Sequence, residues 1–283
     1  MNKSFLVYDG ALFASNSLLL RTGNRAFRYG DGLYETMHYH KGSVLFFDFH
    51  CERLLRAMAT MQLSVKGFIS HTALHESIIN LVMRNRIFGD AVVRLSVFRK
   101  ETGTFGSESQ QASWIIETVP LEIQSFTLNE KGIKVQIFTD FPKHVSPLSP
   151  FRTLSAEPYV FARLWCTNNR MDDCLIVNGQ GKIIESSCSN IFWIKEKVVY
   201  TPKIASGCID GVVRRTVLNL LHHTELKAIE TEGVTLRELH DADELFMTDT
   251  IRGVRWVASL NEKRFYCRVT KEIFGQLYSR AFS

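Results

Sequence analysis

Four short apolar runs lie between Asp173 and Pro202, and they constrain the fold more than any other segment. They are Asp173–Asn178, Lys182–Glu185, Asn190–Ile194 and Val198–Pro202. Tight turns separate them, one of them at 179–181, and runs of four to six residues bounded by turns are typical of strands. Helix-like segments flank this region, near 157–169 and 210–222. The pattern therefore predicts a β-rich unit within an α+β protein.

The first part of the chain predicts a smaller α+β unit. Leu33–His40 has strand character, residues 41–43 form a turn, and Val44–Phe47 is expected to return as a second strand. Asp48 and Ser70 can each cap a helix with an apolar face. Two further strands are expected at 91–98 and 113–119.

The length of 283 residues favours one or two closely packed domains. We predict a small N-terminal α+β domain at 1–119, a linker at 120–128, and a larger β-rich α/β domain at 129–283. The larger domain is expected to begin with a strand at 133–140 and to end in a helix near 268–281.

Composition narrows the class of protein. The net charge of +5 is mild and no block of consecutive basic residues occurs, so nucleic-acid binding is not expected. The six cysteines form no CxxC pair and no cluster with zinc-ligand spacing, so no metal site is expected. No apolar run approaches the roughly 18 residues of a membrane span, and the opening lacks a secretory apolar stretch. A cytoplasmic protein with reduced thiols is the expectation.

Four motifs occur in order along the chain. The first is YGDGLYET at 29–36, followed by FHCERL at 49–54; the others are GKIIESSCSNIF at 181–192, YTP with SGCIDGVVRR at 200–215, and ELFMTDTIRGV at 244–254. Together they resemble the fold-type IV family of pyridoxal-phosphate (PLP) enzymes, which includes branched-chain and D-amino acid aminotransferases and aminodeoxychorismate lyases. The resemblance implies a two-domain, D-amino acid aminotransferase-like fold with a pocket between the domains.

The resemblance also assigns the two ends of the cofactor. The arginine of the H-x-x-R-L motif reaches the phosphate in this family, and it corresponds to Arg53; a guanidinium can bind phosphate through two parallel hydrogen bonds. The acid that keeps the pyridine nitrogen protonated corresponds to Glu185, and this contact makes the ring an electron sink.

Further cofactor contacts are implied around these two residues. Val212 and Val213 would open a helix, and free amides at a helix start bind phosphate. Thr250 is the expected hydroxyl ligand of the phosphate, whereas Thr248 is expected to be a strand residue. Ser189, in the SSCSN segment, is the remaining candidate cofactor residue.

One position departs from the family pattern. The family's lysine, which holds the cofactor as an imine and moves the substrate proton, lies about thirty residues before the glutamate; here Arg152 lies 33 residues before Glu185. A guanidinium, with a pKa above about 12 and delocalised lone pairs, is a poor nucleophile and base at neutral pH. Transamination is therefore expected to be lost or weak. Lys143, nine residues upstream, would need a register shift to reach the site and is not expected there.

Several consequences of Arg152 remain open. PLP could bind without a covalent bond, the pocket could hold another anion that pairs with Arg152, or Tyr34 could act as an unusual base. A degenerate paralogue or a sequence variant is the alternative, as is a scaffold without a ligand. The main rival to an enzyme is a pseudoenzyme that binds PLP or another anion.

Substrate recognition is less constrained. Arg94 and Arg99 lie on one predicted strand and are candidate anchors for a substrate carboxylate; five positions apart, they should face opposite sides, so one of them is expected to face the pocket. The resemblance leaves amino or keto acids and a chorismate-type substrate open, and it implies a homodimer.

Overall fold

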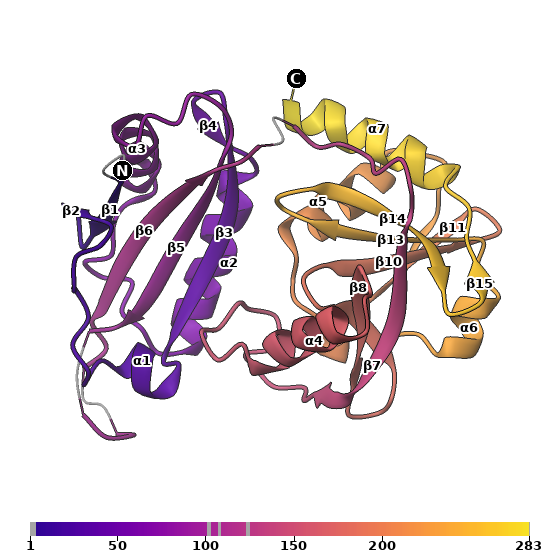
Figure 1. Ribbon diagram of the computed structural model, residues 1–283, viewed down its shortest axis with the longest axis horizontal. Coiled ribbons are helices and arrows are strands. Elements are labelled where there is room, and N and C mark those ends of the chain that lie inside the picture. Colours follow the sequence, from indigo (N-terminus) through magenta and orange to yellow (C-terminus); the bar gives the residue numbers. More distant parts are fainter. Residues whose placement is uncertain (1–3, 101–102, 107–108, 123–124, 283) are drawn as a thin grey trace. The chain divides into compact units, whose positions relative to one another are not determined.

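The computed structural model describes residues 4–100, 103–106, 109–122 and 125–282, which form two compact units (Figure 1). The first unit extends to Ser125 and also takes Phe151–Ser155; the second comprises Phe126–Pro150 and the chain from Ala156 onward. The division falls within the segment expected as a linker, whose residues 123–124 lie outside the described ones. The assignment of Phe151–Ser155 to the first unit was not predicted.

The first unit is built on a six-stranded sheet with the order β2-β1-β6-β5-β3-β4. Its strands are β1 (Phe5–Tyr8), β2 (Ala11–Ala14), β3 (Gly32–His40), β4 (Ser43–Val44), β5 (Ala91–Arg99) and β6 (Ala112–Pro120). Along β5 the side chains at 91, 93, 95 and 97 are buried and those between them are partly exposed, which is the alternation of a strand with one core face. Helices α2 (Phe47–Thr60) and α3 (His71–Arg84) pack against this sheet (Figure 1).

The turn before α2 corrects one sequence prediction. Strand β4 ends at Val44, and Phe46 adopts a left-handed conformation with φ of 55° as the N-cap of a helix that begins at Phe47. Asp48 therefore lies in the first turn of α2, where its charge suits the helix dipole, and is not the cap. This turn leads the chain directly into the helix and buries Leu45 and Phe47. Ser70 caps α3 as expected, accepting the Ala73 amide at 3.3 Å.

The second unit is built on a nine-stranded sheet with the order β12-β11-β10-β13-β14-β7-β8-β9, and β15 pairs with β14. Its strands are β7 (Ile133–Lys143), β8 (Asp173–Asn178), β9 (Ile183–Ser186), β10 (Asn190–Lys195), β11 (Val198–Pro202), β12 (Ala228–Thr231), β13 (Glu244–Asp249), β14 (Gly253–Leu260) and β15 (Lys263–Arg264). The four runs that predicted a sheet are thus β8, β9, β10 and β11.

Helices complete the second unit. They are α4 (Glu157–Asn168), α5 (Val212–Leu221), α6 (Leu236–His240) and α7 (Val269–Phe282), together with a 3₁₀ turn at Ile204–Ser206. The first unit has one further short helix, α1 (Arg25–Tyr29). The predicted helices near 157–169, 210–222 and 268–281 are confirmed. Helix α4 packs against β7 and β8, where Phe138, Cys174 and Ile176 form an apolar cluster with its inner face. Among the helices of the described segments, none has the length and apolarity that a membrane span requires.

Candidate functional site

The buried carboxylate of Glu185 is the centre of the candidate site in the second unit. Glu185 is 2% exposed, and its Oε1 accepts from Lys143 Nζ at 2.7 Å and from the Tyr159 hydroxyl at 2.8 Å. Its Oε2 accepts the backbone N–H of Ile209 at 2.9 Å. Burial of a charged group is tolerated only with such partners. The motif residue chosen from sequence is therefore a fully enclosed, charge-paired carboxylate.

The position of Lys143 corrects the expectation that it lies away from this site. β7 pairs with β8 first as Phe138 with Ile176 and then as Lys143 with Asn178. Five positions on β7 thus match two on β8, so β7 accommodates three extra residues in an irregularity. Ile176 pairs with Glu185, and residues two apart on a strand share a face. The register shift that Lys143 needs is present in the sheet, and it directs Lys143 and Glu185 to one face.

The loop before α5 is held rigidly next to Glu185. Asn190 Nδ2 donates to the Ile209 carbonyl at 2.7 Å, and a Cβ on Gly211 would lie 1.8 Å from Asn190 Oδ1, so this position requires glycine. Gly211 is the N-cap of α5 and no side chain caps the helix, while Val212 and Val213 are buried. A buried helix start without a side-chain cap is suited to an anionic group.

The turn between β13 and β14 contains the candidate hydroxyl. Thr250 lies in the turn and is half-buried, whereas Thr248 lies in β13, as the sequence indicated. Asp249 Oδ1 accepts the amides of Ile251 at 3.0 Å and Arg252 at 2.9 Å, which fixes the turn. Thr248 Oγ1 is buried and has no hydrogen-bond partner among the described residues.

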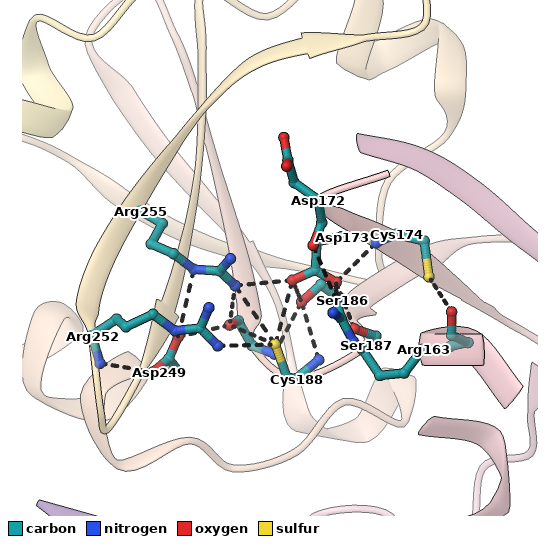
Figure 2. A network of polar contacts seen from close by, with 12 residues as sticks. Arg163, Asp172, Asp173, Cys174, Ser186, Ser187, Cys188, Asp249, Arg252 and Arg255 are labelled. Atoms are coloured by element: carbon teal, nitrogen blue, oxygen red, sulfur yellow. Dashed lines mark hydrogen bonds and ion pairs between the residues drawn. The ribbon is translucent and has the colours of Figure 1, made fainter. Parts of the chain in front are cut away.

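A polar network anchors these turns to the sheet (Figure 2). Asp173 is fully buried and accepts from Arg255 Nη2 at 2.9 Å and from Cys188 Sγ at 3.3 Å. Burial raises the pKa of the Cys188 thiol, and the carboxylates of Asp173 and Asp249 raise it further, so the thiol is a donor here. Ser189 accepts from Arg255 at 3.2 Å and donates to Asp249 at 3.2 Å. Ser189, a candidate cofactor residue, is thus engaged in positioning the β13–β14 turn.

In the first unit Arg53 belongs to a second buried charge cluster. Its Nε and Nη2 donate to the two oxygens of Glu35 at 2.9 and 2.5 Å, and His50 Nδ1 lies 2.6 Å from Glu35 Oε2. Burial alone would raise the pKa of Glu35, but the charge of Arg53 and the hydrogen bonds from His50 and Arg53 lower it from 4.5 to about 2. Burial lowers the pKa of His50, so neutral His50 donates from Nδ1 to the carboxylate. Arg53 is therefore fixed in orientation at the H-x-x-R-L position.

This cluster predicts acid sensitivity of the first unit. The folded-state pKa of Glu35 lies below its unfolded value, so the stabilisation is present above pH 4.5 and is lost as the pH falls toward 2. A pKa difference of about 2.5 corresponds to roughly 3 kcal/mol. Urea unfolding at a series of pH values should show this loss, with hydrogen exchange in β3 identifying the unit. The Glu35→Gln variant should not show this acid-induced loss of stability, whereas a variant at an exposed glutamate, Glu225→Gln, should show it. Equal pH profiles for the unchanged protein and both variants would contradict the assignment.

Two guanidinium groups lie near the Tyr34 ring in the first unit. The Arg94 guanidinium carbon is 4.1 Å from the Tyr34 ring centroid and that of Arg152 is 6.0 Å from it. The Arg152 carbonyl accepts the Tyr34 amide at 2.9 Å, and Thr153 bridges to Leu33, so the 151–155 segment extends the pairing of β3. The structure thus brings Arg94, Arg152 and Tyr34 together.

Arg99 has different surroundings. Its guanidinium donates to Asp31 at 3.0 Å and to the carbonyls of Met61 at 2.8 Å and Ser109 at 3.0 Å. Arg25 donates to the same Asp31 oxygen at 2.7 Å. Arg99 therefore ties the GDG turn to neighbouring loops.

Sequence reasoning missed several residues of these clusters. Tyr159 on α4 and the pair of Asp173 on β8 with Arg255 on β14 carry no local signal, because each contacts a residue that is distant along the chain. Three further ligand-type atoms, from Cys166, Asp173 and Cys174, lie within 4.8 Å of one another. Because the Asp173 carboxylate is already bound by Arg255, we assign this group to the core.

Comparison with known proteins gives the family. Residues 32–260 match the amino-transferase class IV family model. An aminodeoxychorismate lyase of Vibrio harveyi is 24% identical over 243 residues, covering 84% of this chain and 86% of that protein. A branched-chain-amino-acid aminotransferase of Pseudomonas aeruginosa is 26% identical over 272 residues, covering 91% and 85%.

A solved structure agrees in fold. The branched-chain aminotransferase of Thermoproteus uzoniensis, solved with norvaline, matches with a TM-score of 0.87 at 21% identity, covering 98% of this chain and 94% of that chain. The resemblance predicted from the four motifs is confirmed, and so is the two-domain α+β fold. The chain belongs to the amino-transferase class IV family, the fold-type IV group of PLP-dependent enzymes.

Proposed function

We propose that this protein binds PLP without a covalent bond, through the Glu185 side chain and the start of α5. The observation that carries this proposal is the buried Glu185 carboxylate, held by the Ile209 amide two residues before Gly211, the N-cap of α5. A carboxylate suits a pyridine nitrogen and a helix start suits a phosphate. When bound, PLP supplies an electron sink for charge that develops on an amino-acid substrate.

The phosphate would be held by the amides of Val212 and Val213 and the hydroxyl of Thr250. The uncapped α5 start supports the first two, and the position of Thr250 in the fixed β13–β14 turn supports the third. In the first unit the candidate is Arg53, whose guanidinium Glu35 orients. Ser189 contributes by orienting the turn through Asp249.

Arg152 limits which reaction steps the proposed site can perform. A guanidinium cannot replace the amine that forms the covalent link and transfers the proton, because its nitrogen lone pairs are delocalised. We therefore propose that transamination or lyase turnover is lost or severely reduced. Tyr34, whose ring lies near Arg94 and Arg152, is the remaining candidate base, and a phenol hydroxyl would give only slow proton transfer at neutral pH.

The arginine pair beside Tyr34 defines the ligand class. Arg94 would anchor the carboxylate of an amino or keto acid, or of a chorismate-type compound, because guanidinium groups bind carboxylates in a defined plane. We further propose a homodimer, by analogy with the family. The six free thiols support a cytoplasmic location.

A second candidate function is a pseudoenzyme that binds PLP or another anion for regulation. The observation that favours it is Arg152 itself, which adds a fixed positive charge close to Tyr34 where the family has an amine. In this function the protein still binds PLP or another anion but does not turn over a substrate.

Absorption spectra test the main proposal. The purified chain is mixed with PLP, treated with borohydride and analysed by mass spectrometry, in parallel with Arg152→Lys. We expect bound but unlinked cofactor in the unchanged protein and borohydride-stable attachment at residue 152 in the variant, because only the amine can form the covalent link. Turnover with amino acids should appear only in the variant.

Two results would overturn the proposal. Robust turnover by the unchanged protein would show that Arg152 does not limit the chemistry. Absence of PLP binding in both forms would remove the cofactor. Arg163→Lys, which adds a lysine at a half-exposed position of α4, is the control for nonspecific labelling.

A further inference from the structure

We propose that Lys143 is an internal counter-ion that occupies Glu185 and competes with the ring nitrogen of PLP. The inference rests on the proposed function, in which Glu185 receives that nitrogen. It assigns to Lys143 a role in setting cofactor affinity that the family motifs do not contain.

The geometry around Lys143 is that of a fully satisfied ammonium group. Its Nζ has three acceptors, namely Glu185 Oε1 at 2.7 Å, the Tyr159 hydroxyl at 2.7 Å and the Ser149 carbonyl at 3.2 Å. A lysine ammonium has three donors, so each has a partner. The side chains of Lys143 and Glu185 are 10% and 2% exposed, so water screens the pair little.

The same contacts oppose a role for Lys143 as a relocated covalent anchor. Such a role requires a neutral nitrogen with an available lone pair. Here the nitrogen lies against a carboxylate, a hydroxyl and a carbonyl, so acceptors surround it on three sides. In the proposed function Glu185 also faces the ring nitrogen, whereas the covalent link forms at the aldehyde carbon on the opposite side of the ring.

The ion pair with Lys143 makes the Glu185 carboxylate less available to a cofactor. A ring nitrogen that approaches Glu185 must displace the ammonium group or share the carboxylate with it. Either event weakens binding, because it breaks a charge-assisted hydrogen bond in a buried setting. The irregularity in β7 between Phe138 and Lys143 places the ammonium there, so the competition is built into the sheet.

Equilibrium binding of PLP to the full chain tests the proposal. We expect Lys143→Met to bind PLP about ten- to a hundredfold more tightly than the unchanged protein, the range expected from one lost charged contact. Lys143→Gln is the second variant, should the methionine form fold poorly. Lys182→Met removes a longer and more exposed lysine pair, with Glu238 at 3.8 Å, and should leave the affinity unchanged.

A double variant shows whether the effect acts through Glu185. In the Glu185→Gln background, Lys143→Met should give no gain in affinity, because the competed carboxylate is absent. Without PLP, the melting temperature should fall further for Lys143→Met alone than for the double variant, since only the single change leaves a buried carboxylate unpaired.

The outcomes separate this proposal from the proposed function. Equal or weaker PLP binding by both Lys143 variants would overturn the counter-ion role while leaving PLP binding intact. Borohydride-stable PLP on Lys143 of the unchanged protein would also overturn it, and would make Lys143 the covalent anchor. No binding by any variant would overturn the proposed function, and this inference with it.

Discussion

Arg53→Met should reduce the free energy of unfolding of the first unit by about 3–5 kcal/mol. The guanidinium is buried and binds both oxygens of Glu35, so its removal leaves a buried carboxylate with His50 as the partner of one oxygen. Methionine keeps the helix propensity and most of the side-chain volume of arginine. The decrease in the free energy of unfolding therefore reflects the removal of the positive charge. Urea unfolding followed by hydrogen exchange in α2 measures it.

Two control variants make this result interpretable. Arg56→Met removes an arginine one turn along α2, whose pair with Glu52 spans 4.0 Å and is about half exposed. We expect a loss below about 1 kcal/mol there. The Arg53→Met/Glu35→Gln double variant should recover part of the loss, because the unpaired charge is gone. A small loss in Arg53→Met itself would mean that Glu35 does not depend on Arg53.

Asp173→Asn should destabilise the second unit by about 3 kcal/mol, at the lower end of the range for a broken buried ion pair. The carboxylate is fully buried and accepts from Arg255, the Ser187 hydroxyl at 2.6 Å and the Cys174 amide at 2.8 Å. Asp249, 3.7 Å from Arg255, remains as a second carboxylate and limits the loss. Hydrogen exchange in β8 and β14 under urea measures the effect.

The neighbouring residue provides the matched control. Asp172 is exposed, and its side chain points away from the Asp173 network (Figure 2). Asp172→Asn retains an acceptor for the Lys134 amide, so we expect a change below about 1 kcal/mol. If Asp173→Asn is no worse than Asp172→Asn, the buried network does not stabilise the unit. PLP binding should weaken together with stability in Asp173→Asn, because the network fixes the Thr250 turn.

Much of the local structure of the candidate site was predictable from sequence, because its residues lie in contiguous motifs. Glu185 lies within the short strand β9, Val212 and Val213 follow a glycine that starts a helix, and Thr250 follows the strand that ends at Asp249. Each of these positions is set by local chain geometry. Arg53 was predicted as a helical residue, but its bond to Glu35 depends on how α2 packs against β3.

Arg99 and the start of α2 show where local reasoning was insufficient. The parity of strand β5 separated Arg94 from Arg99 correctly, yet only the loops around Asp31 and Met61 show that Arg99 is engaged in structure. Asp48 has a good cap composition, but burial of Leu45 and Phe47 places the helix start before it. Packing therefore outweighs local preference at both positions.

The sequence alone determined the two-unit α+β organisation and the family resemblance, since both are written in contiguous patterns of residues. Only the tertiary structure decided which cation meets Glu185. Lys143 is 42 residues from Glu185 along the chain, and the two meet because β7 takes three extra residues between its pairings with Ile176 and Asn178. The register of a strand depends on its neighbours in the sheet, and no local pattern encodes such an irregularity.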